Sequence, residues 1–224
     1  MKPDDALAAL RAVGDQTDAE GAAAYHKAPR EYLGVRNPVV DDLVREWRAD
    51  IDLTTRIDLA DGLWRSDIHE ARIAAAKLLT QARIKDDEPA WRLIASWVPE
   101  FDAWAIADHA AGAGARRLVA DPSRLDQLEA WTTNPNFWVR RAAMVFTLPW
   151  AKQNHPKPHE REARERILGW AEGYADDREW FIQKAIAWWL RDLSKRDPDR
   201  VRAFLEKNAI RMKAFARKEA AKYL

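Results

Sequence analysis

Four short segments of the chain repeat one pattern of small residues at helical spacing, and this repetition constrains the fold more than any other feature. The segments are 70–76, 104–111, 138–144 and 181–187. Alignment of their small residues places four positions in register: Ile73, Asp108, Arg141 and Lys184. The intervals between these positions are 35, 33 and 43 residues. Intervals of this size are close to the length of a two-helix HEAT-type repeat.

Most of the remaining chain also predicts helix. Apolar residues recur at three- and four-residue spacing, and Gly, Asp, Pro and Asn separate segments of roughly 10–18 residues. Asp121 and Asp197, each followed by a proline, are typical of helix starts. We therefore expect an all-α fold with one domain over residues 1–224, an α-solenoid of HEAT-like two-helix repeats. One helix of each pair lines a concave, partly basic surface in such a stack. That surface is expected to carry Asp108, Arg141 and Lys184.

The composition excludes several kinds of site. The sequence contains no Cys, which rules out a disulfide framework, a thiolate zinc site and a Cys nucleophile. No stretch reaches the roughly 18 apolar residues of a membrane span, and the N-terminus lacks the apolar region of a signal peptide. We therefore expect a cytoplasmic protein without membrane contact. His155 and His159 have no further ligand at suitable spacing, so we expect neither a metal site nor a cofactor.

The charge of the chain is unevenly distributed. The formal net charge is only +1, which by itself argues against a nucleic-acid partner. Residues 113–224, however, contain 23 Lys and Arg against 15 Asp and Glu, whereas residues 1–112 contain 14 against 21. Such asymmetry indicates one end of the molecule that attracts polyanions.

The segment 181–195 predicts an amphipathic helix with a tryptophan inside its basic face. Its apolar stripe consists of Ile182, Ala185, Ile186, Trp189, Leu190 and Leu193. The opposite face carries Lys184, Trp188, Arg191 and Lys195. Cations in this arrangement suit the phosphates of an anionic polymer. The alternative is an indole that merely stacks beneath its cationic neighbours, which is common on helix surfaces.

A second aromatic residue lies close to a carboxylate on the helix that follows Phe101. Trp104 and Asp108 are four residues apart and therefore neighbours on one face, and the residues around them are mostly alanines. A large ring and one carboxylate on an alanine-lined helix are typical of a site. The alternative is a space-filling Trp104, with Asp108 hydrogen-bonded to it or to His109.

Four passages of the chain resemble the AlkD-like family of DNA alkylation-repair glycosylases, which are built from HEAT-like repeats. The passages are Tyr25–Pro38, Trp104–Asp108, Phe137–Phe146 and Trp180–Arg191. They occur in order over most of the chain, and the last is the most specific. The polar loop 153–159 has no clear match and is a departure from the family pattern.

The resemblance implies a role for each matching residue. It places catalysis on Trp104, Asp108 and Trp188, and it implies DNA contacts by Tyr25, Lys27, Arg141 and Arg191. Lys184 and Lys195 extend the basic face and are expected to contact DNA as well. Adjacent arginines cannot both face one groove, so the sequence leaves open whether Arg140 or Arg141 does so.

The implied activity is monofunctional excision of cationic N3- or N7-alkylated purines from double-stranded DNA by a monomer, without a base-flipping pocket. Because such a purine already carries positive charge, a carboxylate that stabilises the developing sugar cation is sufficient. An Asp rather than a Lys in the site implies no Schiff base and no lyase activity. Two other functions remain open: a non-catalytic binder of branched or distorted DNA on the same face, and a protein-binding HEAT scaffold.

Overall fold

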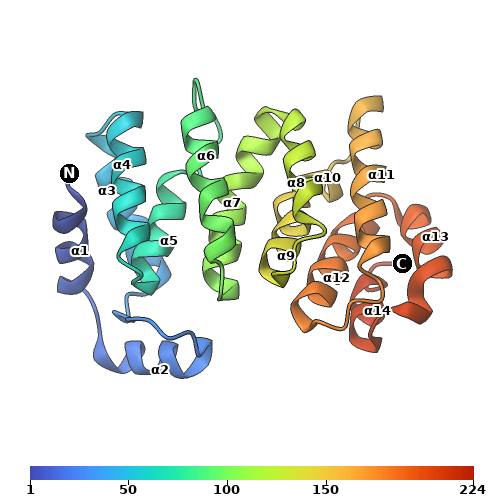
Figure 1. The fold of residues 1–224 in the computed structure, drawn as a ribbon, viewed down its shortest axis with the longest axis horizontal. Helices are drawn as coiled ribbons and strands as arrows, with labels where there is room; N and C mark the ends of the chain where they lie inside the picture. The colour runs from blue at the N-terminus through green and yellow to red at the C-terminus, as the bar shows by residue number, and fades with distance from the viewer. The chain divides into compact units, whose positions relative to one another are not determined.

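The computed structural model describes residues 1–224, which form α-helices and short 3-10 helices without a β-strand. The α-helices are α1 (Pro3–Ala12), α2 (Gln16–His26), α3 (Asn37–Ala49), α4 (Leu53–Arg65), α5 (His69–Leu78), α6 (Glu88–Trp97), α7 (Trp104–Ala120), α8 (Leu125–Trp131), α9 (Phe137–Phe146), α10 (Leu148–Ala151), α11 (Pro158–Gly173), α12 (Trp180–Ser194), α13 (Pro198–Asn208) and α14 (Ala214–Ala220) (Figure 1). The 3-10 helices are η1 (Val98–Glu100), η2 (Pro122–Arg124) and η3 (Ala209–Arg211). The all-α prediction is confirmed.

The chain divides into two compact units, Met1–Arg117 and Leu118–Leu224, with the boundary inside α7. In the first unit, α3 and α4 both pack against α5. In the second unit, α9 and α14 both pack against α12. None of the helices combines the length and hydrophobicity required to cross a membrane.

Hydrogen bonds and ion pairs between successive helix pairs recur at a nearly constant sequence separation. In the first unit four such contacts join residues 36 positions apart: Gly34–Glu70, Asp41–Lys77, Trp64–Glu100 and Gln81–Arg117. In the second unit three join residues 35 positions apart: Glu165–Arg200, Glu172–Lys207 and Asp176–Arg211. These contacts between successive helix pairs therefore recur with a separation close to the repeat length indicated by the small-residue pattern.

Tryptophan rings fill much of the space between the helices. Trp64 and Trp97 stack with their ring centroids 4.4 Å apart in the first unit. Trp189 is fully buried in the second unit, where its Nε1 donates to the carbonyl of Thr147. Burial of such large rings contributes strongly to the core. This packing accounts for part of the chain's unusually high number of tryptophans.

The helix ends follow the predicted chemistry, although the helix lengths are less uniform than expected. Asp197 caps α13 by accepting a hydrogen bond from the Arg200 amide, whereas Asp121 caps the short helix η2 by accepting from the Ser123 amide. The expected lower limit of about 10 residues is wrong for α8, α10 and α14, which have 7, 4 and 7 residues. The helix α10 lies between Thr147, the C-cap of α9, and a loop that ends at Lys157, because residues 158 and 159 of the expected loop 153–159 begin α11.

Candidate functional site

In the first unit, Trp104 and Asp108 lie one turn apart at the start of α7. Their small neighbours Ala103, Ala105 and Ala107 are buried, whereas Trp104 keeps 37% of its surface exposed and Asp108 is half-buried. The alanines thus form the side of the helix that faces the protein core. An indole and a carboxylate remain at the surface of the same turn.

A second aromatic side chain from a distant part of the sequence approaches Trp104. Tyr25, in the last turn of α2, is 69% exposed. Its ring lies edge-on to the Trp104 ring, with the centroids 6.2 Å apart and the planes at 84°. Edge-to-face pairs at this distance are favourable. The structure therefore brings together two of the residues that the sequence singled out.

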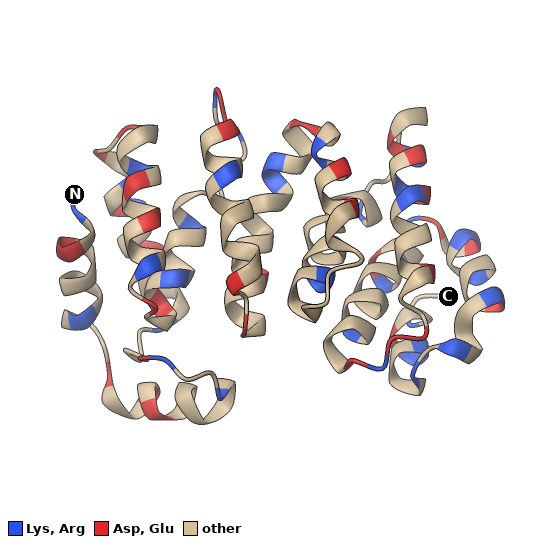
Figure 2. Ribbon diagram, viewed as in Figure 1, with Lys and Arg blue, Asp and Glu red and all other residues tan.

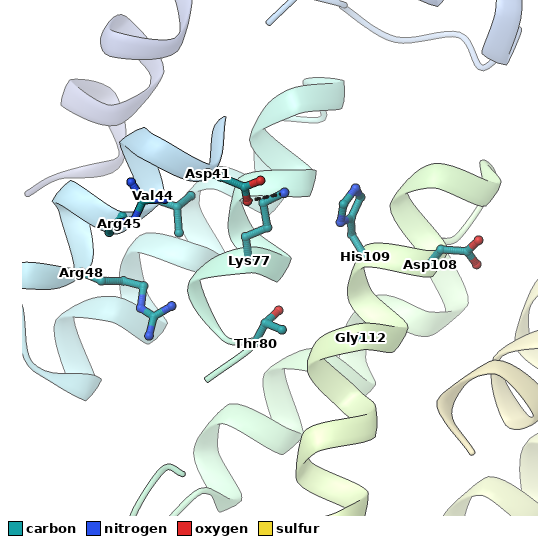
Figure 3. A pocket seen from close by; sticks show the side chains of 9 residues that line it. All are labelled: Asp41, Val44, Arg45, Arg48, Lys77, Thr80, Asp108, His109 and Gly112. Atoms are coloured by element: carbon teal, nitrogen blue, oxygen red, sulfur yellow. Dashed lines mark hydrogen bonds and ion pairs between the residues drawn. The ribbon is translucent and has the colours of Figure 1, made fainter. Parts of the chain in front are cut away.

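A pocket of about 490 Å³ extends from Asp108 towards α3 and α5. It is lined by Asp41, Val44, Arg45, Arg48, Lys77, Thr80, Asp108, His109 and Gly112. Lys77 pairs with Asp41, and the Asp108 carboxylate points away from this pair, at the other side of α7 from the cations of α3 (Figure 3). The pocket thus has Asp108 at its rim on α7, and Arg45, Arg48 and the paired Lys77 and Asp41 on the side of α3 and α5.

His109 lies between the carboxylate and the cations of this pocket. Burial lowers the pKa of His109, and the charge of Lys77 lowers it further, while Asp108 and Asp41 raise it. The net result is an imidazole that is neutral near pH 7. The positive charge of the pocket therefore comes from Lys77 and the two arginines.

In the second unit, Trp188 lies in the middle of α12 and is half-buried. Its Nε1 donates a hydrogen bond of 3.1 Å to the carboxylate of Asp192, one turn further along the helix. The same carboxylate lies 3.5 Å from the ammonium of Lys152 and 3.6 Å from the guanidinium of Arg191. Asp192 was not among the predicted site residues, although its i, i+4 spacing from Trp188 is a signal that the sequence contains.

The predicted basic face of α12 is only partly available for a ligand. Lys184 is exposed. Arg191 is half-buried and pairs with Glu219 of α14, and the Lys195 ammonium lies 4.4 Å from the centre of the Tyr223 ring. Figure 2 shows Lys and Arg recurring along α12, α13 and α14.

The adjacent arginines of α9 have different surroundings. Arg140 donates to the carbonyl of Asn134 at 2.8 Å and to the carboxylate of Asp177 at 2.9 Å, so it ties α9 to the loop before α12. Arg141 is 4% exposed, and its guanidinium lies 5.8 Å from the Trp138 ring and 6.0 Å from the Phe181 ring. Arg140 is therefore occupied within its own unit.

Lys27 and His26 end the helix that carries Tyr25. Lys27 is exposed and adopts a left-handed conformation with φ of 57° as the C-cap of α2. The His26 ring lies 5.4 Å from the Trp104 ring. Sequence reasoning singled out Tyr25 and Lys27 but missed His26, because its ring contacts are with residues far away in the chain.

Comparison with known proteins places this chain among repair proteins. A family model described as DNA alkylation repair enzyme matches residues 6–224. The structure is similar to a predicted DNA alkylation repair enzyme from Enterococcus faecalis, with 21% identity, coverage of 94% of this chain and 96% of that chain, and a TM-score of 0.78.

Two structures from Streptococcus mutans are also similar. AlkD2 has 20% identity, coverage of 85% of this chain and 91% of that chain, and a TM-score of 0.62. The protein smu.31 of strain UA159 has 21% identity, coverage of 83% and 91%, and a TM-score of 0.63. No curated protein matches this sequence. At these identities, the structural similarity shows a common helical-repeat fold.

Proposed function

Because this chain belongs to the DNA alkylation repair enzyme family, we propose that it is a monofunctional DNA glycosylase. The proposed reaction is hydrolysis of the N-glycosidic bond of cationic N3- or N7-alkylated purines in double-stranded DNA. The observation that carries the proposal is the arrangement on α7, where a half-buried carboxylate, Asp108, lies one turn from the exposed indole of Trp104. A protein that only bound DNA would need cations but no carboxylate at such a place, since an acid repels phosphates.

The proposed chemistry requires few groups. An alkylated purine that already carries a positive charge leaves without a general acid, and positive charge then develops on the deoxyribose. The Asp108 carboxylate stabilises that charge and positions the attacking water. The faces of Trp104 and Trp188 attract positive charge through their ring quadrupoles and exclude bulk water from the sugar.

The surroundings of the two tryptophans support these roles. Tyr25 contacts Trp104 edge-on, which leaves indole surface exposed, and the hydrogen bond to Asp192 fixes the ring plane of Trp188. A ring with a fixed plane loses little conformational freedom when the sugar binds. The proposal includes neither a base-flipping pocket nor a cofactor, because the cationic lesion supplies its own leaving-group activation.

DNA binding is assigned to cationic side chains, with phosphates as their ligands. Lys184 and Lys195 are exposed on α12, and Lys27 is exposed beside Tyr25. Arg191, which is half-buried, and Arg141, which is 4% exposed, are assigned to DNA binding as well. A monomer is proposed to bind the alkylated duplex.

The test is release of 7-methylguanine or 3-methyladenine from a methylated duplex by the purified protein. We expect the wild type to release free base and Asp108→Asn to lose at least about 10²-fold of that activity, with duplex affinity and thermal stability retained. A wild type that binds the duplex but releases no base would overturn the proposal and favour a non-catalytic binder of distorted DNA. Absence of salt-dependent duplex binding would instead favour a protein-binding scaffold.

A further inference from the structure

The helix that carries Tyr25 is held to the first unit by very few contacts. None of the residues of α2 is buried, and the helix runs across the direction of its neighbours (Figure 1). The adjoining loop is fixed by Glu70 of α5, whose carboxylate accepts hydrogen bonds from the Leu33 and Gly34 amides. Some other group must therefore determine where the C-terminal end of α2 places Tyr25.

The ring of His26 is that group. Its centroid lies 5.0 Å from that of Tyr25 and 5.4 Å from that of Trp104, so it contacts both members of the exposed pair. Behind it, His26 stacks on Tyr32 at 6.2 Å with the planes 4° apart, and it lies 4.6 Å from His69. His26 thus connects the exposed rings to α5.

The support behind His26 is well fixed. His69 is 5% exposed at the start of α5, and its amide donates a 3.0 Å hydrogen bond to the carbonyl of Glu31. The Tyr32 ring lies 4.8 Å from His69, and its hydroxyl donates to the carbonyl of Ala28. The contacts therefore run from α5 through His69 and Tyr32 to His26, and from there to Tyr25 and Trp104.

We propose that His26 is a positioning residue of the glycosylase, which holds the Tyr25–Trp104 pair in place in its neutral form and weakens the site when it is protonated. The inference rests on the proposed excision of cationic nucleotides. Aromatic faces attract a cation only when no competing cation lies among them. A protonated His26 would place such a charge beside Trp104, one of the two indoles proposed to receive the positively charged sugar.

The environment of His26 favours the neutral imidazole. Its Nδ1 and that of His69 are buried without a hydrogen-bond partner. Burial lowers the pKa of His26, and the Arg30 charge lowers it further, whereas the Glu70 charge raises it. The position of His26 in the last turn of α2 favours the cation through the helix dipole, which opposes the effect of its partial burial on the pKa.

The charged and titratable groups around His26 come from three elements. They are Asp18 and Tyr25 on α2, Arg30, Tyr32 and Arg36 in the following loop, and His69 and Glu70 on α5. Arg30 pairs with Asp102 and Asp67, and Arg36 pairs with Asp18. The two arginines are therefore largely neutralised by their own partners. Burial of the imidazole remains the main reason for its neutrality.

The first experiment compares the pH dependence of kcat/KM for base release with a histidine NMR titration of the free enzyme between about pH 5 and 8.5. The variants are His26→Phe, which keeps a ring but cannot be protonated, and His26→Ala, which removes the ring. His155→Phe, at an exposed position in the loop before α11, is the matched control. His26→Phe also assigns the His26 signal in the NMR spectrum.

We expect kcat/KM of the wild type and of His155→Phe to decrease as the pH is lowered. The midpoint of this decrease should equal the midpoint of the His26 titration measured by NMR. In His26→Phe this decrease at low pH should be absent. His26→Ala should lower kcat/KM about tenfold at every pH, since Tyr25 and Trp104 lose an aromatic neighbour. Thermal unfolding is measured alongside: His26→Phe keeps a ring at this half-buried position and should retain the wild-type stability, whereas His26→Ala loses the ring contacts and should lower it. A merely structural role for His26 would leave the decrease at low pH in His26→Phe.

Two results would overturn the inference: an unchanged decrease at low pH in His26→Phe, or wild-type kcat/KM in His26→Ala. A wild type that releases no base at any pH would instead overturn the proposed function and, with it, the catalytic part of the inference. In that case the NMR titration still tests the positioning role of His26, independently of catalysis. A His26 midpoint below about 6.5 that moves in Trp104→Ala supports the ring cluster, and a midpoint that does not respond to Trp104→Ala overturns it.

Discussion

The two units of the chain present a tryptophan in different ways. In the first unit Trp104 stands exposed at the beginning of a helix, and the rings of Tyr25 and His26 lie close to it. In the second unit Trp188 stands in the middle of a helix, half-buried, and a carboxylate accepts its Nε1–H. The first arrangement leaves a ring face available for a ligand, whereas the second fixes the orientation of the ring.

The carboxylates of the two units differ in a corresponding way. Asp108 is half-buried at the rim of a pocket, while Asp192 is 8% exposed and is surrounded by Trp188, Lys152 and Arg191. A carboxylate with this many local partners has little capacity left for a substrate. We therefore assign support of Trp188 to Asp192, and the proposed chemistry remains with Asp108 beside the exposed Trp104.

The sharpest test of this difference, with the largest expected effect, compares the same substitution in both units. Asp108→Asn should lower kcat for base release by at least about 10²-fold, because it removes the charge that stabilises the sugar cation. Asp192→Asn keeps an acceptor for the Trp188 indole, so we expect a loss of no more than about tenfold. Single-turnover base release measures both. Equal losses in the two variants would contradict the division of roles.

A second, smaller effect concerns stability in acid, which should be specific to the first unit. Burial, together with nearby positive charge, lowers the pKa of His69 to about 3. The unfolded chain therefore binds a proton near pH 6.5 while the folded unit does not. Above about pH 6.5 the His69 imidazole is neutral in both the folded and the unfolded state, so it leaves the free energy of unfolding unchanged. Below that pH the free energy of unfolding falls by about 1.4 kcal/mol per pH unit until the folded pKa is reached.

The measurement for His69 is denaturant unfolding of the wild type and of His69→Phe at about pH 7 and pH 5. The wild type should lose about 2 kcal/mol more than the variant between these pH values. His159→Phe, at an exposed position in the first turn of α11, is the control and should behave like the wild type. An identical pH dependence of wild type and His69→Phe would show that the buried imidazole is not neutral.

The smallest expected effect concerns the phosphate contacts assigned to the second unit. Lys184→Ala should reduce the slope of log binding constant against log salt by about 0.9, since each phosphate contact releases about that fraction of a counterion. Lys85→Ala, an exposed lysine of the first unit, is the matched control and should leave the slope unchanged. Duplex binding at several salt concentrations measures both. A reduced slope only in Lys85→Ala would place the DNA contacts on the other unit.

Much of the fold could be predicted from local sequence patterns. The helical spacing of apolar residues and the Asp–Pro capping signals depend on neighbours within a few residues, and the structure confirms them at Asp197. The repeat length followed from small residues that allow close packing of helices. The short helices such as α10 were missed, because their ends depend on tertiary contacts, such as the hydrogen bond from Trp189 Nε1 to the Thr147 carbonyl, rather than on a sequence signal.

The candidate site was predictable only in part. The positions of Trp104 and Asp108 on one helical face followed from spacing, and the i, i+4 position of Asp192 relative to Trp188 could have been used in the same way. The partners Glu219, Tyr223 and His26 could not be predicted, because they approach from other helices. A periodic pattern indicates which face is polar but not which distant side chain will neutralise a cation on it.

The contacts between successive helix pairs bear on the order in which the site folds. Most of them join residues about 36 positions apart, whereas Arg30 reaches Asp102 across 72 positions and lies with Tyr25 near the start of α7. Closing a longer loop costs more chain entropy and is rewarded later in folding. The contacts around Trp104 should therefore form after the contacts between successive helix pairs. They should also open first when the protein begins to unfold. The enzyme would then lose its aromatic pair through local opening, with the helical stack still intact.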